Sequence, residues 1–425
     1  MTIGILGGGI TGITIQRFLN QESEILEASS KPGGLCRTYW KDGFGYDIGG
    51  HILFSKHEAI NTLVDKLLEG NLNSCKRANK IFYNGHFVKY PFENDLAALG
   101  KEEAFECLIH YIRNTYPKPN NLKEWAYYTF GKGIAEKYLI PYNEKIWNIP
   151  ADQLSLEWVD RIPKPPMEDV VKSALGIETE GYLHQLYFRY PTEGGAEGLI
   201  HALMKEKSNI TSNFKISSIR KKSDGWEVSD GSKTKTYEKL VLTFPMHEAI
   251  KCFENVPAEV LSAIDGFRYN SMRIVFLAVN DESLMNHSAV YIPDPEVITH
   301  RVCYMGYFSK KLVRPGTSSL IAEITTNPGD GVFEMTDSEC IEKTIADLNR
   351  IGLIDKEKII TTDLQRVKYG YPVYDLSYSK NVKIMRDWFK SIGVTLCGRF
   401  AEFEYINSDE CMKRALSVAQ ELNTR

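Results

Sequence analysis

The chain has 425 residues, of which 43% are hydrophobic and 25% are charged, and its formal net charge is -4 at pH 7. This composition is typical of a globular protein with a large apolar core, and the length predicts two or three domains at about 100–200 residues each. A nearly balanced charge without a long basic run excludes nucleic acid as the main partner. No stretch approaches the roughly 20 apolar residues of a membrane-spanning helix, so we expect no membrane partner.

The eight cysteines are scattered along the chain, and no two stand in a CxxC pair. This distribution excludes a CxxC metal knuckle or redox pair and is typical of the reducing cytoplasm, which is the compartment that we expect. The nine histidines include no HExxH pattern, so we expect no bound metal. The N-terminus is apolar but lacks a basic segment and is interrupted by glycines, so we do not expect a signal peptide there.

The first elements of the chain predict a dinucleotide site. Residues 2–6 form a short apolar run typical of a strand, and the turn Gly-Gly-Gly-Ile-Thr-Gly follows at 7–12. Helical spacing continues to about residue 20, and a second short strand at 24–26 ends in Glu27. A strand, a glycine turn, a helix and a strand that ends in an acid form the fingerprint of a Rossmann-like unit.

Each part of this fingerprint has a physical role. Gly7 permits the tight turn, Gly9 lets the backbone approach a pyrophosphate, and Gly12 lets the helix pack on the sheet. The helix N-terminus offers N–H donors and a positive dipole to the phosphates, and Glu27 would accept both ribose hydroxyls. A turn that bound nothing would leave the cost of three adjacent glycines, about 1 kcal/mol each, unexplained.

A second glycine pair favours FAD over NAD as the cofactor. Lys-Pro-Gly-Gly-Leu-Cys-Arg at 31–37 follows the acidic residue, and Gly-Phe-Gly-Tyr-Asp-Ile-Gly-Gly-His stands at 43–51. This arrangement resembles the large group of FAD enzymes that includes amine oxidases and protoporphyrinogen oxidases, in which the loop covers the flavin's diphosphate and ribityl chain. The C-terminal end resembles the same group, because a strand at 394–396 runs into a glycine and a helix over 409–422 follows.

The rest of the chain separates into a mainly helical part and a part rich in strands. Helical spacing predicts helices at 59–68, 102–114, 132–140 and 338–350. Alternating or β-branched runs predict strands at 215–220, 226–229, 240–243, 273–279, 289–292, 302–307 and 320–325, with a hairpin turn at 230–231.

These elements predict an α/β fold in which a Rossmann-like FAD-binding domain is interleaved with a helical insert and an antiparallel-sheet substrate domain. We expect the discontinuous FAD-binding domain to comprise residues 1–75, 187–252 and 390–425. Residues 76–186 would form a mainly helical substrate-side domain, and residues 253–389 would form the antiparallel sheet. The active site is expected where these parts meet.

Several segments match one family closely, in order and over essentially the whole chain. They are Asp-Ile-Gly-Gly-His-Ile-Leu-Phe-Ser at 47–55, Lys-Tyr-Pro-Phe-Glu-Asn at 89–94, Phe-Gly-Lys-Gly at 130–133, Pro-Tyr-Asn-Glu-Lys-Ile-Trp at 141–147, Tyr-Phe-Arg-Tyr-Pro at 187–191, Tyr-Gly-Tyr-Pro at 369–372, and Gly-Arg-Phe at 398–400 with Tyr405. Together they resemble UDP-galactopyranose mutase, and its eukaryotic-type branch more than the common bacterial one. The segments at 141–147 and 398–400 are the most specific, because the FAD motifs alone do not distinguish this family.

The resemblance implies an isomerase that uses FAD without net redox change and interconverts the pyranose and furanose forms of UDP-galactose or a related nucleotide sugar. In this family, reduced FAD is thought to attack the anomeric carbon through N5 and expel the nucleoside diphosphate, and the resulting adduct recloses as the other ring form. The implied partner is a nucleotide-sugar substrate, in cell-surface polysaccharide biosynthesis. NAD(P)H is a candidate reductant, although the sequence shows no separate nicotinamide site, and a homo-oligomer stays open.

The resemblance also implies roles for individual residues. His51 matches the segment that lies against the flavin N5, and Arg301 and Arg399 match arginines that hold the diphosphate, for which a planar guanidinium group is suited. Residues that match the substrate site are Tyr90, Glu93, Asn143 and Trp147 for the uridine pocket, and Tyr291, Tyr371, Tyr405 and, more loosely, Arg189 for the phosphates. Residues that match the cofactor site are Gly7, Gly9, Ile10, Thr11, Gly12, Glu27, Ala28, Gly34, Leu35, Arg37, Gly49, Gly50, His51, Gly398, Arg399 and Asp409.

Three positions depart from the family, and all of them are at the substrate end. Glu93 stands where the family carries a glutamine that touches uracil, and a carboxylate accepts hydrogen bonds but donates none. Ala289 replaces a tryptophan, and Glu193 replaces an arginine of the eukaryotic-type branch. We therefore consider the hypothesis that Glu93 accepts from a base N–H and that the preferred nucleotide need not be uridine.

Two other functions stay open at this point. An FAD oxidase or desaturase of the amine oxidase or protoporphyrinogen oxidase type shares all the FAD motifs. Such an enzyme would need an apolar tunnel for its substrate, whereas Arg301 and Arg399 suit an anionic substrate. A flavin-binding protein that has lost catalysis is consistent with the altered substrate-side positions.

Overall fold

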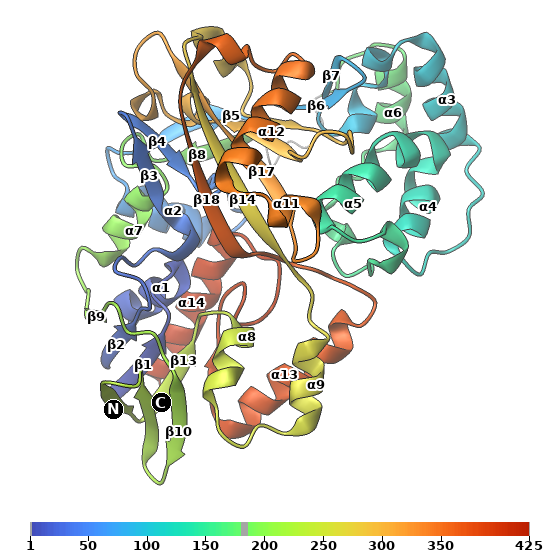
Figure 1. Ribbon diagram of the computed structural model, residues 1–425. Coiled ribbons are helices and arrows are strands. Elements are labelled where there is room, and N and C mark those ends of the chain that lie inside the picture. The colour runs from blue at the N-terminus through green and yellow to red at the C-terminus, as the bar shows by residue number, and fades with distance from the viewer. Residues whose placement is uncertain (1, 180–185, 425) are drawn as a thin grey trace.

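A computed structural model describes residues 2–179 and 186–424 of the chain. The part that contains the N-terminal glycine turn is a parallel sheet in the order β19-β13-β1-β2-β9. These strands are β1 (Thr2–Leu6), β2 (Glu22–Leu26), β9 (Ile210–Thr211), β13 (Lys239–Leu242) and β19 (Thr395–Leu396). Figure 1 shows this part at the lower left, where N-terminal, middle and C-terminal segments lie together. The predicted interleaving of a Rossmann-like unit is thereby confirmed.

Two helices from opposite ends of the chain cover this sheet. The helix α1 (Ile10–Phe18) begins at the glycine turn and packs against α14 (Ser408–Asn423). Their apolar faces share one core with the strands, in which Ile3, Ile13 and Met412 are almost completely buried. The cofactor end of the fold is therefore closed by the last helix of the chain.

The second layer is a seven-stranded sheet in the order β18-β14-β17-β16-β15-β6-β7. Its strands are β6 (Asn79–Tyr83), β7 (His86–Lys89), β14 (Tyr269–Val279), β15 (Ala289–Tyr291), β16 (Arg301–Tyr304), β17 (Ser318–Thr326) and β18 (Ile359–Pro372). All neighbours are antiparallel except β15 and β6, which run parallel. The strand β14 pairs with β17 on one side and with β18 on the other over nearly its whole length, so these three strands form the longest part of the sheet.

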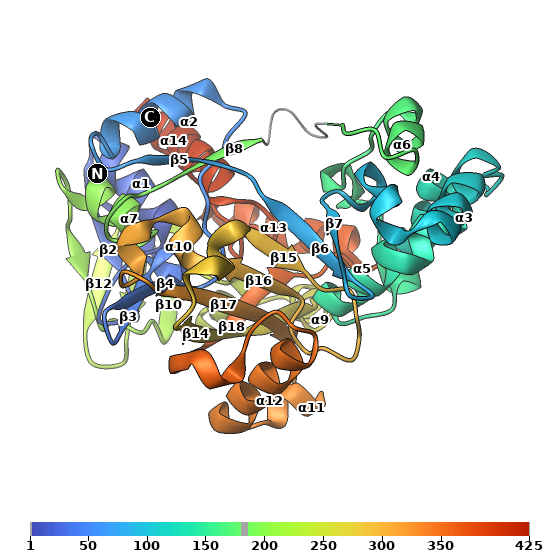
Figure 2. The same ribbon diagram turned by 90° about the horizontal axis from the view of Figure 1, so that it is seen from above.

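Alternate residues of this sheet face two different cores, as the two-residue period of a strand requires. In β14, Val275 and Leu277 face the helix α12 (Asp337–Arg350), while Ile274 and Phe276 face the opposite side. Figure 2 shows α12 and α11 (Gly331–Glu334) together below the sheet. The opposite face of the sheet is therefore left for the helical part and for the site.

The helical part lies at the right of Figure 1. It contains α3 (Lys101–Ile112), α4 (Leu122–Ile134), α5 (Ile140–Trp147) and α6 (Met167–Ala174). The chain bends inside α4 at Gly131, whose φ is 71°, and a π-helical turn, η4 (Ala135–Leu139), leads into α5. Such turns often mark functional positions. Here the turn places the predicted Pro-Tyr-Asn segment against the sheet.

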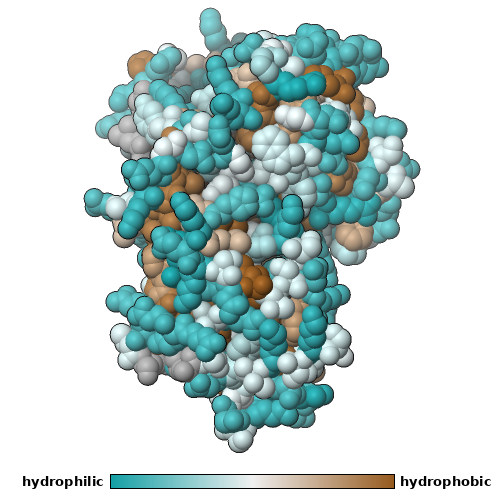
Figure 3. Space-filling view, turned by 90° about the vertical axis from the view of Figure 1, so that its left-hand side faces the viewer, coloured by the Kyte–Doolittle hydropathy of each residue, from teal (hydrophilic) through white to brown (hydrophobic). Residues whose placement is uncertain are grey.

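The remaining elements connect these parts. The helices are α2 (Glu58–Leu67), α7 (Glu197–Met204), α8 (Met246–Ala249), α9 (Ala258–Asp265), α10 (Met305–Phe308) and α13 (Tyr378–Ile392). The strands are β3 (Thr38–Lys41), β4 (Phe44–Asp47), β5 (Asn73–Lys76), β8 (Tyr187–Tyr190), β10 (Ser218–Lys222), β11 (Gly225–Ser229) and β12 (Thr234–Tyr237). The face of the molecule seen in Figure 3 is mainly hydrophilic, with small separate apolar areas. None of the helices in the described ranges is long and apolar enough to cross a membrane.

The structure differs from the expected elements in several places. The strand expected at 302–307 ends at Tyr304, where α10 begins, and the helix expected at 132–140 spans the bend and the π-helical turn. The strands β6 and β7 come from the range 76–186, for which we expected a mainly helical domain, yet they extend the seven-stranded sheet. Pairing between β6 and β15 is long-range, so local sequence patterns do not reveal it.

The bend at Gly131 gives a test of the packing between α3 and α4. A Cβ at Gly131 would overlap the carbonyl oxygen of His110, whereas a Cβ at Gly70, which also has a positive φ, would meet no atom within 4 Å. Both Gly→Ala changes cost about 1 kcal/mol in backbone strain, and overlap in Gly131→Ala adds roughly 1–3 kcal/mol. Urea unfolding should therefore show Gly131→Ala clearly less stable than Gly70→Ala. Equal free energies of unfolding would contradict the packing described here.

Candidate active site

One large cavity, of about 1740 Å³, extends between the parallel sheet, the seven-stranded sheet and the helical part. Its walls include the glycine turn at 7–11 at one end and Tyr90, Tyr138 and Asn143 at the other. A pocket for a single small ligand has a volume of about 300–1,000 Å³. The cavity is therefore large enough for a cofactor and a substrate together.

The glycine end of the cavity has the properties of a phosphate cradle. Gly9 is the N-cap of α1, no side chain caps the helix, and a Cβ at Gly9 would meet no protein atom within 4 Å. Gly33 lies against the turn, because its N–H donates to the carbonyl oxygen of Gly8 at 2.7 Å. The open space beside Gly9 and the uncapped helix terminus fit a diphosphate.

The other glycines of the motif have structural roles. A Cβ at Gly12 would overlap the carbonyl oxygen of Gly7, and one at Gly398 would lie 2.7 Å from the Thr11 hydroxyl. Gly12 and Gly398 are therefore close-packing positions behind the cavity wall, in which neither takes part. Of the other residues expected at the cofactor, those that line the cavity are Gly7, Gly9, Ile10, Thr11, Glu27, Ala28, Gly34, Leu35, Arg37, Gly49, Gly50, His51, Arg399 and Asp409.

Glu27 lies at the tip of β2 with its carboxylate held by the backbone. One oxygen accepts from the N–H of Gly8 at 2.8 Å, and the other accepts from the N–H of Ser29 at 2.7 Å. A carboxylate has about four lone-pair sites, so acceptor capacity is left for a ligand. The open cradle and this oriented carboxylate together fit the diphosphate and ribose of a dinucleotide such as FAD.

His51 lies farther along the same cavity. Burial, together with the positive charges of Arg399 and Arg301, lowers the pKa of His51 to about 4. Its imidazole is therefore neutral at pH 7, and its Nδ1 is buried without a hydrogen-bond partner among the described residues. A buried and unpaired ring nitrogen beside the cofactor end is available to a ligand.

Arg301 is held by a carboxylate that the sequence motifs do not reveal. Its Nε and Nη2 donate to the two oxygens of Glu323 at 3.0 and 2.6 Å. Burial acts against the charge of Arg301, but the neighbouring Glu323 carboxylate holds its pKa well above the ordinary value. Glu323 is fully buried and also accepts from the N–H of Gly50 at 3.2 Å. The sequence did carry one signal for Glu323, because it is the single acid in the apolar run of β17.

Two further arginines meet at one tyrosine. The guanidinium group of Arg399 lies 4.5 Å from the ring centre of Tyr405 and 5.8 Å from that of Tyr371, and that of Arg161 lies 4.7 Å from Tyr405. Arg161, Arg301 and Arg399 all line the cavity. They form a cationic site of the kind that binds phosphate groups.

The third arginine was expected at Arg189, and the structure places that residue elsewhere. Arg189 forms an ion pair with Asp65 and takes no part in the cavity wall. Arg161 lines the cavity instead, at the end of the short 3-10 helix η6 (Val159–Arg161), which follows α5 in the chain. Its neighbour Trp158 packs on Trp147 with ring centres 5.0 Å apart, which ties this segment to α5.

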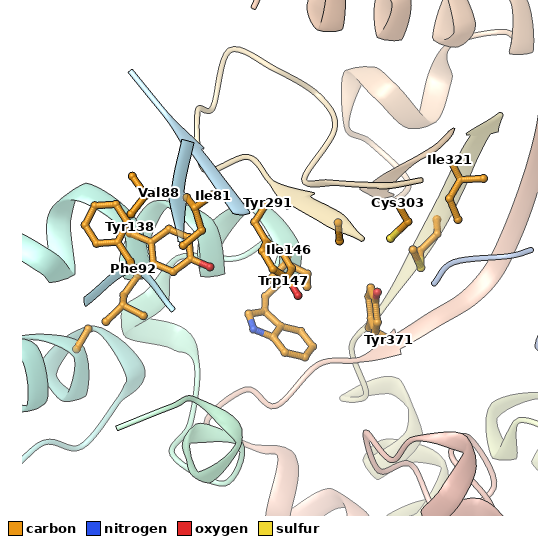
Figure 4. Packing of buried hydrophobic residues seen from close by; sticks show 14 of the residues in the cluster. Ile81, Val88, Phe92, Tyr138, Ile146, Trp147, Tyr291, Cys303, Ile321 and Tyr371 are labelled. Atoms are coloured by element: carbon orange, nitrogen blue, oxygen red, sulfur yellow. The ribbon is translucent and has the colours of Figure 1, made fainter. Parts of the chain in front are cut away.

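Beyond the arginines, the cavity ends between aromatic walls. Tyr90 and Tyr291 have ring centres 5.0 Å apart, and Tyr138 stacks on Tyr142 at 5.4 Å. Figure 4 shows Tyr138 and Phe92 at one side, and Tyr291, Ile146 and Trp147 between them and Tyr371. Tyr90, Tyr291, Tyr138 and Tyr142 all line the cavity, which therefore offers flat apolar walls to a planar group.

Asn143 and Trp147 of α5 are used differently from each other. The Asn143 side chain lines the cavity, donates to the Leu139 carbonyl oxygen at 2.7 Å and accepts from Trp147 Nε1 at 3.2 Å. Trp147 is almost fully buried behind the wall and packs against Tyr371 and Tyr405. Trp147 therefore supports residues that line the cavity and is not itself part of its wall.

The three positions that depart from the family lie in different places in the structure. Glu93 is 2% exposed and lines the cavity, whereas Glu193 lies at the surface near Lys311 and Ala289 is buried in β15. Of these three residues, only Glu93 lines the cavity. Among the described residues, no three His, Cys, Asp or Glu side chains are grouped as a metal site.

Fold and site together define a dinucleotide-binding protein with a second, cationic ligand site. Two family models agree with this class: an NAD(P)-binding Rossmann-like domain over residues 5–67, and a flavin containing amine oxidoreductase over residues 164–391. The second covers more than half of the chain. The chain belongs to the flavin-containing amine oxidoreductase family.

Within this group, the chain is similar to the crystal structure of a reduced UDP-galactopyranose mutase, with a TM-score of 0.91 and 25% sequence identity over 99% of this chain and 95% of that one. It is also 22% identical to coproporphyrinogen III oxidase of Staphylococcus aureus, over 99% of this chain and 98% of the oxidase. A putative protoporphyrinogen oxidase from Exiguobacterium has the same fold, with a TM-score of 0.78 and 18% identity over 100% of this chain and 98% of that one. The resemblance to UDP-galactopyranose mutase is thereby confirmed. The similar proteins comprise a mutase and two oxidases, and so they belong to two reaction classes.

The phosphate cradle gives a direct test of cofactor binding. In Gly9→Val, the Cβ would enter the open space beside α1 without meeting a protein atom within 4 Å, so the fold should persist while the diphosphate is excluded. We expect Gly9→Val to purify with less than about a tenth of the native flavin content, because even one added carbon blocks close backbone approach. A matched control is Gly331→Val, since a Cβ there also meets no atom within 4 Å. Native flavin absorbance in Gly9→Val, at an unchanged melting temperature, would contradict the assignment.

Proposed function

We propose that the protein is a flavin-dependent nucleotide-sugar mutase, which interconverts the pyranose and furanose forms of UDP-galactose or a related nucleotide sugar. The observation that carries this proposal is the position of Arg161, Arg301 and Arg399, which line the cavity between the glycine cradle and the aromatic walls. A nucleotide sugar has a planar base, a diphosphate and a sugar in this order. The similarity to a reduced UDP-galactopyranose mutase supports the same reaction class.

FAD would be held by the glycine turn, by Glu27, and by the wall at Gly49 and Gly50. The chemistry that bound FAD supplies is an electron-rich ring beside the sugar, used without net oxidation. Keeping FAD reduced requires an external reductant, for which NAD(P)H is our candidate.

The three arginines would act on the leaving diphosphate. As the bond between the anomeric carbon and the diphosphate breaks, negative charge grows on the phosphate oxygens, and fixed guanidinium groups stabilise it. Glu323 fixes Arg301 by two hydrogen bonds, so little reorganisation is needed at that moment. The same contacts would retain the diphosphate until it returns to the sugar.

Neutral side chains would complete the site. Burial, with the nearby Glu323 charge, raises the pKa of Tyr371 well above its ordinary value, so its hydroxyl keeps its proton and can donate to a phosphate oxygen. His51 stays uncharged above about pH 4 and can exchange a hydrogen bond with bound FAD or with the sugar. Its neutrality avoids a further cation beside the three arginines.

A second candidate is an FAD oxidase, favoured by the similarity to coproporphyrinogen III oxidase over nearly the full length of both chains. Coproporphyrinogen also carries carboxylates, so arginines alone do not separate the two functions. Flat walls formed by tyrosines and a bidentately fixed Arg301 suit a base and a diphosphate better than a wide macrocycle.

The discriminating experiment uses the flavin-loaded protein, reduced anaerobically with dithionite. We expect it to convert UDP-galactopyranose, or another member of a nucleotide-sugar panel, to its furanose form, detected by chromatography, without production of hydrogen peroxide. No conversion of any nucleotide sugar, together with peroxide formation from coproporphyrinogen III in air, would replace the mutase by the oxidase.

The role of the arginines gives a second prediction. Arg399→Ala should lower the rate of sugar interconversion by about 100-fold or more, since it removes a charged donor from the developing oxyanion. Flavin content should stay close to native, because the glycine turn and Glu27, which would hold the cofactor, are unchanged in this variant. Arg220→Ala, which removes an exposed arginine paired with Glu254, is the control. Loss of flavin from Arg399→Ala, or near-native turnover, would show that Arg399 has another role.

A further inference from the structure

Glu93 is a buried acid that no other part of the fold explains. It lies in the short 3-10 helix η2 (Phe92–Asn94), is 2% exposed and lines the cavity. Its Oε1 has no hydrogen-bond partner among the described residues. A buried polar atom without a partner costs about 1–3 kcal/mol, so an unpaired carboxyl oxygen in a cavity wall indicates a ligand that pairs with it.

The backbone around Glu93 is fixed. The Ser173 hydroxyl of α6 donates to the Glu93 carbonyl oxygen at 2.7 Å, and the N–H of Asn94 donates to the Pro91 carbonyl oxygen at 2.9 Å. Phe92 stacks on Tyr138 with ring centres 5.2 Å apart and planes within 10°. The segment that carries Glu93 is therefore held in place where this residue lines the cavity.

No charged side chain among the described residues offsets the burial of Glu93. The ionisable side chains that interact with it are Tyr111 of α3 and Tyr138 of η4; burial raises the pKa of both, so both hold their protons at neutral pH. The ammonium group of Lys89, on the adjacent β7, donates to the Thr179 carbonyl oxygen. No basic side chain of the described ranges forms an ion pair with Glu93. Burial accordingly raises the pKa of Glu93 to about 8.

An un-ionised carboxyl group has different hydrogen-bonding ability from a carboxylate. It presents an O–H donor beside a carbonyl acceptor, whereas the ionised form only accepts. Uracil presents an N–H next to a carbonyl oxygen and so pairs with the un-ionised acid through two hydrogen bonds. Guanine presents two adjacent N–H donors and would pair with the ionised form. The expectation from sequence, that Glu93 acts only as an acceptor, does not allow for its burial.

We propose that Glu93 is a specificity-determining residue that binds the substrate's nucleobase as an un-ionised carboxyl group, and that the substrate is therefore a nucleotide of a uracil-like base rather than of guanine. This inference rests on the proposed function only in assigning the aromatic end of the cavity to a base. It concerns binding, so it does not require that the sugar is turned over.

The test measures the dissociation constant of UDP, by calorimetry on the flavin-loaded protein, from about pH 6.5 to about pH 9. The matched variant is Glu93→Gln, which keeps a donor and an acceptor but does not titrate. Native protein should lose about tenfold in affinity relative to Glu93→Gln across this range, because a group with a pKa near 8 is mostly un-ionised at the lower limit and about nine-tenths ionised at the upper one. Dividing the two constants at each pH cancels titration of UDP itself and of other side chains.

At about pH 6.5, the two proteins should bind UDP within about threefold of each other, and both should bind GDP at least about tenfold more weakly. The same pH dependence in both proteins, much weaker UDP binding by Glu93→Gln at low pH, or preference for GDP would each overturn the inference. Absence of UDP binding would overturn it as well. Failure of the mutase function alone would instead appear as intact, pH-dependent UDP binding without sugar interconversion.

Discussion

The buried carboxylate of Glu323 is the point at which the parts of this molecule are joined. It lies in β17, an interior strand of the seven-stranded sheet, and it accepts from Arg301 of β16 and from the N–H of Gly50. The first contact orients the arginine, and the second attaches the flavin-side loop to the substrate-side sheet. An ion with no solvent exposure is stable only when such donors surround it. The orientation of Arg301 and its position relative to the loop at Gly50 therefore depend on this one group.

The division of one cavity into two ligand ends follows from the layers that enclose it. The parallel sheet ends in a glycine turn and a helix N-terminus, which favour phosphate. The sheet face opposite α12 supplies Arg301 and Tyr371, while α5 and η4 supply aromatic rings. Hence one cavity combines a phosphate cradle, three arginines and aromatic walls, which are the groups that a nucleotide sugar beside a flavin would require.

Local chemistry made much of the fold predictable. The glycine turn, Glu27 and the strand–helix alternation depend on neighbours in the sequence, and the structure has the predicted Rossmann-like unit. Long-range pairing was not predictable, since β6 joins β15 across some two hundred residues. The strand β18 and the helix α13 were not among the expected elements either, although Val382, Met385 and Phe389 recur at helical spacing, so α13 did carry a local signal. A strand's partner is set by tertiary packing, for which a single sequence carries no local signal.

The site shows the same limit. Motif matches placed Arg301, Arg399 and Glu93 at the cavity, but they did not reveal Glu323 or Arg161 and they favoured Arg189. An ion pair satisfies Arg189 at the surface, and only the fold shows which arginine has room to face the cavity. The structure also changes the reading of Glu93, because burial determines whether an acid carries charge.

The role of Glu323 is tested most directly by comparing Glu323→Gln with the native protein in binding UDP and uridine. If Glu323 orients Arg301 toward a diphosphate, the variant should lose about tenfold or more in UDP affinity, about 1.4 kcal/mol, while its uridine affinity and flavin content stay unchanged. Equal losses for UDP and uridine, or no loss for either, would contradict the central claim that this ion pair positions the diphosphate site.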